Sequence, residues 1–595
     1  MPAPKIPTDL RLYYLHREPP TMEGVRHLQS YFPSLETLFP SIVDQSTGHP
    51  SLAAKEMVTQ VDLSAGTSIV EDLHTHVQRS VPTWIRKMHL VEPIQVLSGE
   101  YAIPEDGSLP TFRGAWQRAL RKLNDPLNEA YTDAVFACMA SRLVETGRSP
   151  HFCRFYGTYN GRVSEYNYNM TDDLNDVEGE PWYREGLKQG AFRVIAMDPF
   201  DPDVTAEVTR PWEDVRYRLF GAASEEEGET LSTDDQSQEE EAIEKAEEAE
   251  AVKETKDTEE AADELVEADI EFSGTATIHR PPIRLSRVSG EPSGSDSSYS
   301  SGSEDDIDYR LIVKDFPVQL TVLERCDGTM DDLMEDEIAE DATTDMRETK
   351  EARWTAWMFQ VIAGLTTAQQ HYDFVHNDLH TNNVMWSGTG ETHLYYHVTG
   401  AAGGDRFYRV PTFGRIMKII DFGRATFRPP MAAATKVPTW INDAYAPLAD
   451  AGGQYNCGPY FNHGMPKVTP NKSFDLCRLA VAMLETLWPE PVEPVSPPKM
   501  LTKEQGRTTN ETVSPLWNLL WLWLTDRFGK NVLYSSDGTE RYPQFDLYCA
   551  IARDSQNAIP SQQLTLPLFD SAFRCRRKDI PTDATIWRLV ATHKN

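Results

Sequence analysis

The chain has 595 residues, 40% of them hydrophobic, and a formal net charge of -35. This length exceeds one small core and predicts several domains or one large fold with insertions. The excess of 92 acidic over 57 basic side chains argues against a surface that binds nucleic acid or an anionic membrane.

Cysteine usage and apolar runs predict an intracellular protein outside the membrane. The seven cysteines are scattered, without a close metal-ligand pair or the density of a secreted domain. The start, "MPAPKIPTDLRLYYLHREPP", has no basic segment followed by an apolar run, so we expect no signal peptide. The apolar cluster "LWNLLWLWL" at 516–524 is far shorter than the roughly 20 residues of a membrane span, and it predicts a core helix.

The first strong helical pattern is "NDPLNEAYTDAVFACMASRLVETG" at 124–147. Asp125 predicts the cap of this helix, Pro126 its first turn and Gly147 its end, which makes about five turns. The next segment, "HFCRFYGTYNG" at 151–161, is rich in β-forming residues and ends at a turn glycine, so it predicts a strand.

An acidic and then serine-rich segment runs from Ser224 to Asp308. Residues 221–270 alone hold 21 acidic and 3 basic side chains. Low apolar content and like-charge repulsion predict a disordered insert that could recruit partners. Three serines near arginines or acidic residues are candidate phosphorylation sites, with a plain solvated linker as the alternative: Ser286, Ser289 and Ser303.

Four more elements are expected after the insert. "FPVQLTVLERCDG" at 316–328 predicts a strand, and "EARWTAWMFQVIAGLTTAQQHY" at 351–372 predicts a helix with one buried stripe. "GRIMKIIDFGRATF" predicts a buried strand that ends at Asp421. "SFDLCRLAVAMLETLWP" predicts a helix stopped by Pro489.

Polar residues gather between apolar ones in "FVHNDLHTNNVMW" at 374–386. Asn and Asp favour turns, so a plain loop is one interpretation. His376, Asp378 and Asn383 match the catalytic loop of protein kinases in residue type and spacing. The tripeptide "DFG" that begins at Asp421 matches the second kinase motif, and the chain thus resembles the protein kinases.

This resemblance implies an α+β, bilobal protein kinase-like fold, with a small, mainly antiparallel β N-lobe and a mainly α-helical C-lobe. It implies transfer of the γ-phosphate of ATP to Ser or Thr of a protein substrate, with Mg²⁺ as cofactor. In the catalytic loop that contains His376, Asp378 would act as the base or orient the acceptor hydroxyl. Asn383 and Asp421 would supply hard oxygen ligands to Mg²⁺, and Asp475 resembles the buried aspartate that anchors this loop.

Kinases also pair a lysine on a strand with a glutamate on the helix that follows. On "VPTWIRKMHLV" the resemblance implies Lys87, with Arg86 as the rival, as the cation that binds ATP. Glu129 resembles the glutamate, although a helix-dipole or surface charge is the alternative.

"TVLERCDG" resembles the strand and hinge whose backbone holds adenine. Leu323 would face the nucleotide, while Glu324 and Cys326 would offer backbone groups.

The chain departs from the kinase pattern at several positions. The segment "DLSAGTSIV" has only Gly66 in place of a glycine-rich loop. Asn377 stands where most kinases carry the arginine that pairs with a phosphorylated loop, so we expect activity that does not require such phosphorylation. His380 replaces a lysine of serine/threonine kinases, which leaves the acceptor open. The long interval from Asn383 to Asp421 predicts an added hairpin.

"HNDLHTNNVMW", "KIIDFGRA" and "DPLNEAY" together most resemble the divergent serine/threonine kinases encoded by large DNA viruses of eukaryotes. This resemblance implies a place in the host cytoplasm or in the virion. The expected division is an N-terminal extension, a first N-lobe part, the insert, the last N-lobe strand with the hinge, and the C-lobe: 1–60, 61–223, 224–308, 309–335 and 336–595.

Two other functions stay open from the sequence. "HNDLHTNN" also resembles the loop of aminoglycoside and choline kinases, which phosphorylate small molecules. The missing glycine-rich loop and the uncertain lysine favour a nucleotide-binding pseudokinase or scaffold with an acidic partner-recruiting arm.

Overall fold

The computed structural model describes the chain in several stretches. These are residues 13–14, 19–38, 52–101, 118–198, 204–219, 307–428, 455–456, 466–487, 503–508 and 515–592, with gaps inside several of them. The insert expected at 224–308 lies outside the described residues except for its last two positions. The candidate phosphorylation sites Ser286, Ser289 and Ser303 lie outside them as well.

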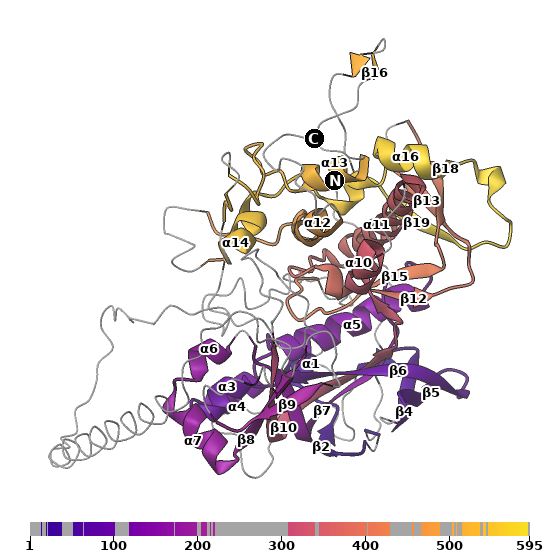
Figure 1. Ribbon diagram of the computed structural model, residues 1–595. Coiled ribbons are helices and arrows are strands. Elements are labelled where there is room, and N and C mark those ends of the chain that lie inside the picture. The colour runs from indigo at the N-terminus through magenta and orange to yellow at the C-terminus, as the bar shows by residue number, and fades with distance from the viewer. Residues whose placement is uncertain are drawn as a thin grey trace, which may run out of the picture.

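The protein is of the α+β class, as expected, and its largest sheet has eight strands that pair antiparallel (Figure 1). The strand order is β2-β7-β10-β6-β5-β4, and β8 pairs with both β10 and β9. The strands are β2 (Val25–Gln29), β4 (Glu56–Asp62), β5 (Thr67–Asp72), β6 (Gln78–His89), β7 (Phe155–Asn169), β8 (Phe192–Met197), β9 (Thr205–Val208) and β10 (Asp308–Glu324). The strands predicted at 151–161 and 316–328 are therefore confirmed as parts of β7 and β10. The turn expected at Gly161 is wrong, because β7 continues through this residue and pairs with β10 there.

Residues expected to form a separate N-terminal extension take part in this sheet. β2 pairs with β7, and β4 pairs with β5. Helix α1 (Pro33–Leu38) packs near α5, and Phe32 stacks on Tyr131 with ring centroids 5.0 Å apart. The boundary predicted at residue 60 falls inside β4, because hydrogen bonding to β5 starts at Glu56.

Helix α5 (Glu129–Glu145) is the helix predicted at 124–147, and it begins later than predicted. Asn128 caps it, since its side chain accepts a hydrogen bond from the Ala130 N–H at 3.1 Å. Asp125, the predicted cap, instead accepts from Leu127 N at 2.9 Å in the preceding turn. Most side chains of α5 are buried, because this helix contacts β7, β10, α1 and α11.

The other part of the molecule is mainly helical and lies above the eight-stranded sheet in Figure 1. Its longest helix, α11, buries Trp354 and Trp357 edge to face, with ring centroids 5.2 Å apart. The helices are α10 (Met330–Ala339), α11 (Thr344–Tyr372), α12 (Phe474–Leu487), α13 (Pro515–Trp523), α14 (Phe545–Asp554), α15 (Pro560–Gln563) and α16 (Pro567–Phe573). The helices predicted from the apolar patterns correspond to α11, α12 and α13. The single buried stripe expected for α11 is wrong, because every residue from Trp354 to Gln369 is buried.

A hairpin fills the long interval between Asn383 and Asp421, as predicted. β13 (His393–Thr399) and β14 (Arg406–Pro411) pair antiparallel. Two segments from near the end of the chain extend this hairpin: β19 (Ile586–Val590) pairs parallel with β13, and β18 (Arg574–Cys575) pairs with β14.

A three-stranded sheet positions the polar loop that follows α11. Its order is β11-β12-β15, from β11 (Gly328–Thr329), β12 (Val384–Gly388) and β15 (Arg415–Ile419). The central strand β12 begins directly after the loop, and β15 ends just before Asp421. Antiparallel pairing therefore brings the end of the loop beside the end of β15.

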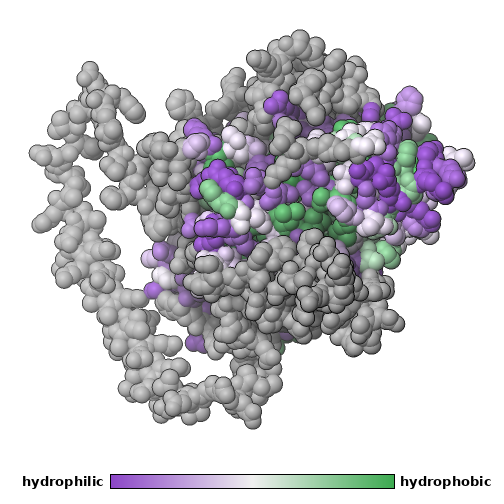
Figure 2. All heavy atoms as spheres, turned by 90° about the horizontal axis from the view of Figure 1, so that it is seen from above, coloured by the Kyte–Doolittle hydropathy of each residue, from purple (hydrophilic) through white to green (hydrophobic). Residues whose placement is uncertain are grey.

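Short elements complete the described chain. They are β1 (Tyr13–Tyr14), β3 (Leu52–Ala53), α3 (Pro93–Leu97), α4 (Arg118–Leu123), α6 (Leu174–Val177), α7 (Pro181–Gln189), β16 (Lys503–Glu504) and β17 (Arg507–Thr508). Seen from above, Figure 2 shows hydrophilic side chains over much of the described surface of this face, with hydrophobic ones gathered towards the middle. Among the described residues, no helix has both the length and the apolar character that crossing a membrane requires.

Candidate functional site

The loop at 373–383, between α11 and β12, is anchored by Asp475 at the start of α12. The Asp475 carboxylate is fully buried and accepts the His376 N–H with both oxygens at 3.0 Å. Its Oδ1 atom also accepts the Asn377 N–H at 3.0 Å. Burial raises the pKa of Asp475 to about 6, although these N–H groups act in the opposite direction. The predicted anchoring role of Asp475 is confirmed.

The same loop is bonded to the end of β15. The imidazole Nε2 of His376 donates to the Ile420 carbonyl at 2.8 Å, since a carbonyl can only accept. The Ile420 N–H donates to the Asn383 carbonyl at 3.1 Å. Two hydrogen bonds therefore hold the loop against the residue that immediately precedes Asp421.

Asn377 has the geometry that favours an asparagine over most other residues. Its φ is 66°, in the left-handed region that short amide side chains tolerate. Its Nδ2 donates to the carbonyls of Val375 at 3.1 Å and Arg424 at 2.9 Å. Asn377 thus links the loop to the chain after the "DFG" motif through neutral bonds. The expectation of activity without phosphorylation stays a prediction.

The side-chain amide of Asn383 is oriented by two bonds of its nitrogen. Its Nδ2 donates to the Asp378 carbonyl at 2.9 Å and to His380 Nε2 at 2.9 Å. Because the Asp378 carbonyl can only accept a hydrogen bond, it must face Nδ2 of Asn383. The Oδ1 atom of the same amide therefore points away from this carbonyl. In the described part of the chain Oδ1 has no hydrogen-bond partner, and it is a hard oxygen atom.

Asp378 itself is half-buried, and its carboxylate interacts electrostatically with the Arg424 guanidinium. Burial alone would lower the pKa of Arg424, but the carboxylates of Asp378 and Glu129 raise it above its usual value. The Glu129 carboxylate lies 4.0 Å from Arg424 Nε, and burial raises the pKa of Glu129 despite this cation. Glu129 therefore belongs to the surroundings of Asp378 and Arg424.

The expected pair of Lys87 and Glu129 is replaced by Arg86 and Asp133. Arg86 Nη2 lies 2.5 Å from Asp421 Oδ1, and Arg86 Nε lies 3.4 Å from Asp133 Oδ2. Because successive side chains of a strand point to opposite faces, Arg86 faces α5 while Lys87 is exposed on the other face of β6. Asp133 lies one helical turn after Glu129, on the same face of α5. The structure therefore pairs Arg86, the predicted rival, with Asp133 and does not bring Lys87 to Glu129. Which of these residues binds ATP stays a prediction.

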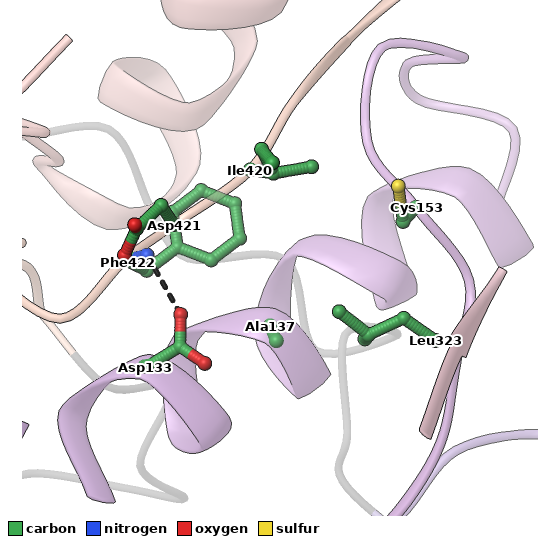
Figure 3. Close-up of a pocket in the computed structure, with 7 residues that line it drawn as sticks. All are labelled: Asp133, Ala137, Cys153, Leu323, Ile420, Asp421 and Phe422. Atoms are coloured by element: carbon green, nitrogen blue, oxygen red, sulfur yellow. Dashed lines mark hydrogen bonds between the residues drawn. The ribbon is translucent and has the colours of Figure 1, made fainter. Parts of the chain in front are cut away.

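Arg86, Asp133 and Asp421 form what we call the charged cluster. Asp133 also accepts the Phe422 N–H at 2.7 Å, the bond drawn in Figure 3. Burial, and secondarily the charge of Asp421, raise the pKa of Asp133 to about 6 against the effect of Arg86. For Asp421 burial acts in the same direction, but the Arg86 guanidinium brings its pKa below the usual value. One guanidinium thus sits between two carboxylates.

A small cavity opens between α5, the end of β10 and the segment after β15. Figure 3 shows its lining, which consists of Asp133, Ala137, Cys153, Leu323, Ile420, Asp421 and Phe422. Leu323 lines this cavity. Its side chain thus has the orientation that the predicted adenine pocket requires. Its cross-strand neighbour on β6 is Trp84, which is 63% exposed.

The segment predicted to hold adenine is bonded to the turn before β7 and to β15. The Glu324 N–H donates to the Arg154 carbonyl at 2.9 Å, so this N–H is already occupied. Use of the Glu324 carbonyl by a ligand stays a prediction. The Glu324 carboxylate accepts from Arg154 N at 3.0 Å and from Lys418 Nζ at 3.3 Å. The Cys326 side chain points to Cys153, with 3.4 Å between the two sulfur atoms. The predicted use of the Cys326 backbone stays a prediction.

Sequence reasoning missed Asp133 and Arg424 as members of the site. A signal for Asp133 was present, because it repeats the position of Glu129 one turn later on the same helix face. Arg424 directly follows the "DFG" tripeptide, but nothing in the sequence indicated that it would face Asp378. Among the described residues, no group of three or more His, Cys, Asp or Glu side chains has metal-binding geometry.

Comparison with known proteins adds no family, because no family model matches the chain and no curated protein matches it.

Proposed function

We propose that the chain is an ATP- and Mg²⁺-dependent protein kinase that phosphorylates Ser or Thr of a protein. The observation that carries this proposal is the pair of bonds from Ile420 to His376 and Asn383, which holds the loop against the "DFG" segment. Asp378, Asn383 and Asp421 come from one loop and one strand end that these bonds join. Phosphoryl transfer needs little more from a protein than such positioned oxygen atoms and cations.

The arrangement of the elements is consistent with a bilobal kinase-like fold. In the proposal, the eight-stranded sheet with α5 forms the N-lobe, and the helices around α11 form the C-lobe. The linker 325–327 would connect them, since it joins β10 to β11. The cavity between α5, β10 and β15 would mark the inner end of the nucleotide site.

The donor atoms present fit Mg²⁺. Asn383 Oδ1 and the Asp421 carboxylate are hard oxygen ligands, and Mg²⁺ is usually held by one or two such groups together with substrate phosphates and water. When bound, the ion would screen the phosphate charges of ATP.

The chain's own residues would then divide the work. Asp378 would orient the acceptor hydroxyl and take up its proton, and Arg424 would balance the charge of Asp378. Arg86 would offer its guanidinium to phosphate oxygens, which this planar fork binds well. Asp133, on α5, would hold two groups in place. It pairs with the Arg86 guanidinium, and it accepts the backbone N–H of Phe422 in the "DFG" motif.

Transfer of labelled phosphate from ATP tests the proposal. We expect the wild-type chain with Mg²⁺ to label a mixed protein acceptor, and Asp378→Asn to lower the rate roughly 100- to 10,000-fold, the usual contribution of a general base. Asp373→Asn is the matched control, because this aspartate lies on the same loop but pairs with the surface cations Arg428 and Lys472. Near wild-type transfer by Asp378→Asn would contradict the mechanism.

The same assay separates the other functions. Transfer to aminoglycosides or choline, and not to proteins, would identify a small-molecule kinase. A nucleotide-binding pseudokinase or scaffold is favoured by one observation: Arg86 already occupies an oxygen of Asp421, a proposed metal ligand. ATP binding without transfer to any acceptor would support that second function.

A further inference from the structure

Cys153 and Cys326 lie together although they are 173 positions apart in the chain. Cys153 belongs to the turn between α5 and β7, and Cys326 belongs to the linker after β10. Their sulfur atoms are 3.4 Å apart. A disulfide bond is about 2.05 Å long, so a shift of roughly 1.4 Å would join them.

The surroundings of the two thiols are already bonded to each other. Lys418 Nζ donates to the Phe152 carbonyl at 3.1 Å and to the Glu324 carboxylate at 3.3 Å. The turn before β7 and the end of β10 are also joined by the bonds between Arg154 and Glu324. These contacts hold the backbones on both sides of the sulfur pair close to each other.

The two thiols differ in reactivity. Cys326 is half-buried, whereas Cys153 is buried. The hydrogen bond between the two thiols lowers the pKa of Cys326, and Lys418 acts in the same direction against burial. The same hydrogen bond, together with burial, raises the pKa of Cys153 well above its usual value. Since thiolates are the nucleophiles in disulfide exchange, Cys326 would react first and Cys153 second.

We propose that Cys153 and Cys326 form a reversible disulfide site that is oxidised by low-molecular-weight disulfides such as oxidised glutathione. The Cys326 thiolate attacks one sulfur of glutathione disulfide, and the first glutathione thiolate leaves. Cys153 then attacks the Cys326 sulfur, the mixed disulfide breaks, and the proton of Cys153 goes to the second departing thiolate. The protein loses two electrons, and one glutathione disulfide becomes two thiols.

This site is separate from the proposed kinase chemistry but lies beside it. Cys153 lines the cavity together with Leu323 and Phe422. A disulfide would fix the linker 325–327 to the turn that precedes β7. It would also constrain the unfolded chain over a long loop, so the oxidised protein should unfold at a higher temperature than the reduced one.

The test uses the full chain, equilibrated in mixtures of reduced and oxidised glutathione and then mapped as non-reduced peptides. We expect one cross-linked pair, Cys153 with Cys326, which disappears again in reduced glutathione. In Cys153→Ser, the glutathione adduct on Cys326 should persist, because the second thiol is missing. In Cys326→Ser, Cys153 should stay unmodified.

Cys575→Ser is the matched control, because Cys575 is half-buried and far along the chain from this pair. This variant should form the cross-link as the wild type does. Melting of each reduced variant reports whether it is folded, and if one is not, the wild-type peptide map decides alone. Adducts on Cys575 without the Cys153–Cys326 cross-link would overturn the proposal, as would equal modification of Cys153 in wild type and Cys326→Ser.

Discussion

The loop at 373–383 and the charged cluster lie side by side but are held by different forces. The loop is fixed by hydrogen bonds of the backbone and of neutral side chains, with the Asp475 carboxylate accepting two N–H groups. The charged cluster joins three separate elements, β6, α5 and the segment after β15, through one guanidinium and two buried carboxylates.

The two regions are therefore sensitive to different kinds of substitution. In the hydrogen-bonded loop, a substitution removes the partners of only the groups that it contacts. The stability lost is then the desolvation free energy of those unpaired groups. In the charged cluster the balance of charge is collective, because removing Arg86 would leave two carboxylates buried without their cation. We therefore expect larger effects from single changes in the charged cluster than in the loop.

The largest expected effect is that of Arg86→Met. Because it leaves Asp133 and Asp421 uncompensated, we expect the free energy of unfolding to fall by about 3 to 5 kcal/mol. The neighbouring change Lys87→Met is the control, since Lys87 is exposed, and it should change stability by less than about 0.5 kcal/mol. Urea unfolding of both variants measures this, and equal effects would show that the assignment of the cation is wrong.

The loop is tested by Asp475→Ala. This change leaves the buried N–H groups of His376 and Asn377 without an acceptor, so unfolding should become easier by about 2 to 3 kcal/mol. Asp373→Asn removes only partly exposed ion pairs and keeps a residue that tolerates the left-handed backbone here (φ 53°), so it should cost less than about 1 kcal/mol. Thermal melts of the two variants compare them. A loss at Asp475 larger than that at Arg86 would reverse the ranking of the two regions.

A smaller, pH-dependent effect is expected at His151, which connects both parts of the molecule. Its Nδ1 bonds the Met417 carbonyl at 3.0 Å and its Nε2 bonds the Tyr396 hydroxyl at 2.8 Å. Burial lowers the pKa of His151 to about 3. The unfolded chain binds this proton first, so the stability due to neutral His151 is present above pH 6.5 and is lost as the pH falls towards 3.

The measurement for His151 is the free energy of unfolding at pH 7 and pH 5. One proton contributes about 1.4 kcal/mol per pH unit, or roughly 2 kcal/mol between the ordinary histidine pKa and pH 5. In His151→Gln this part of the acid loss should be absent. If wild type and variant lose equal stability between pH 7 and pH 5, His151 does not remain neutral in the folded protein.

The same two regions differ in what the sequence could predict. His376, Asp378 and Asn383 lie within eight residues, so their order and spacing defined the loop before any contact was known. Arg86 and Asp133 come from elements that meet only in the folded chain. Lys87 and Arg86 are both basic, and the strand face that decides between them depends on β6 pairing with β10. No local pattern contains that register.

The fold followed the same division. The long helices were predicted from the spacing of their apolar residues, and β7 and β10 from their β-forming residues. The nearly complete burial of α5 and α11 was not predicted, because it depends on the elements that pack around them. The participation of residues before 60 in the sheet was not predicted, since β2 reaches β7 across more than a hundred residues. The parallel pairing of β19 with β13 was likewise invisible, because it joins the end of the chain to a hairpin in its middle.

Binding of ATP with and without Mg²⁺, measured by titration calorimetry, tests most directly whether the two regions form one site. If Asn383 and Asp421 bind Mg²⁺ together with ATP, we expect Mg²⁺ to tighten ATP binding by the wild-type chain at least about tenfold, which is about 1.4 kcal/mol. Asp421→Asn should remove this dependence on Mg²⁺, while Asp373→Asn should preserve it. Binding that is equally tight without Mg²⁺, or a full Mg²⁺ effect in Asp421→Asn, would show that the loop and the charged cluster do not form one Mg²⁺-dependent ATP site.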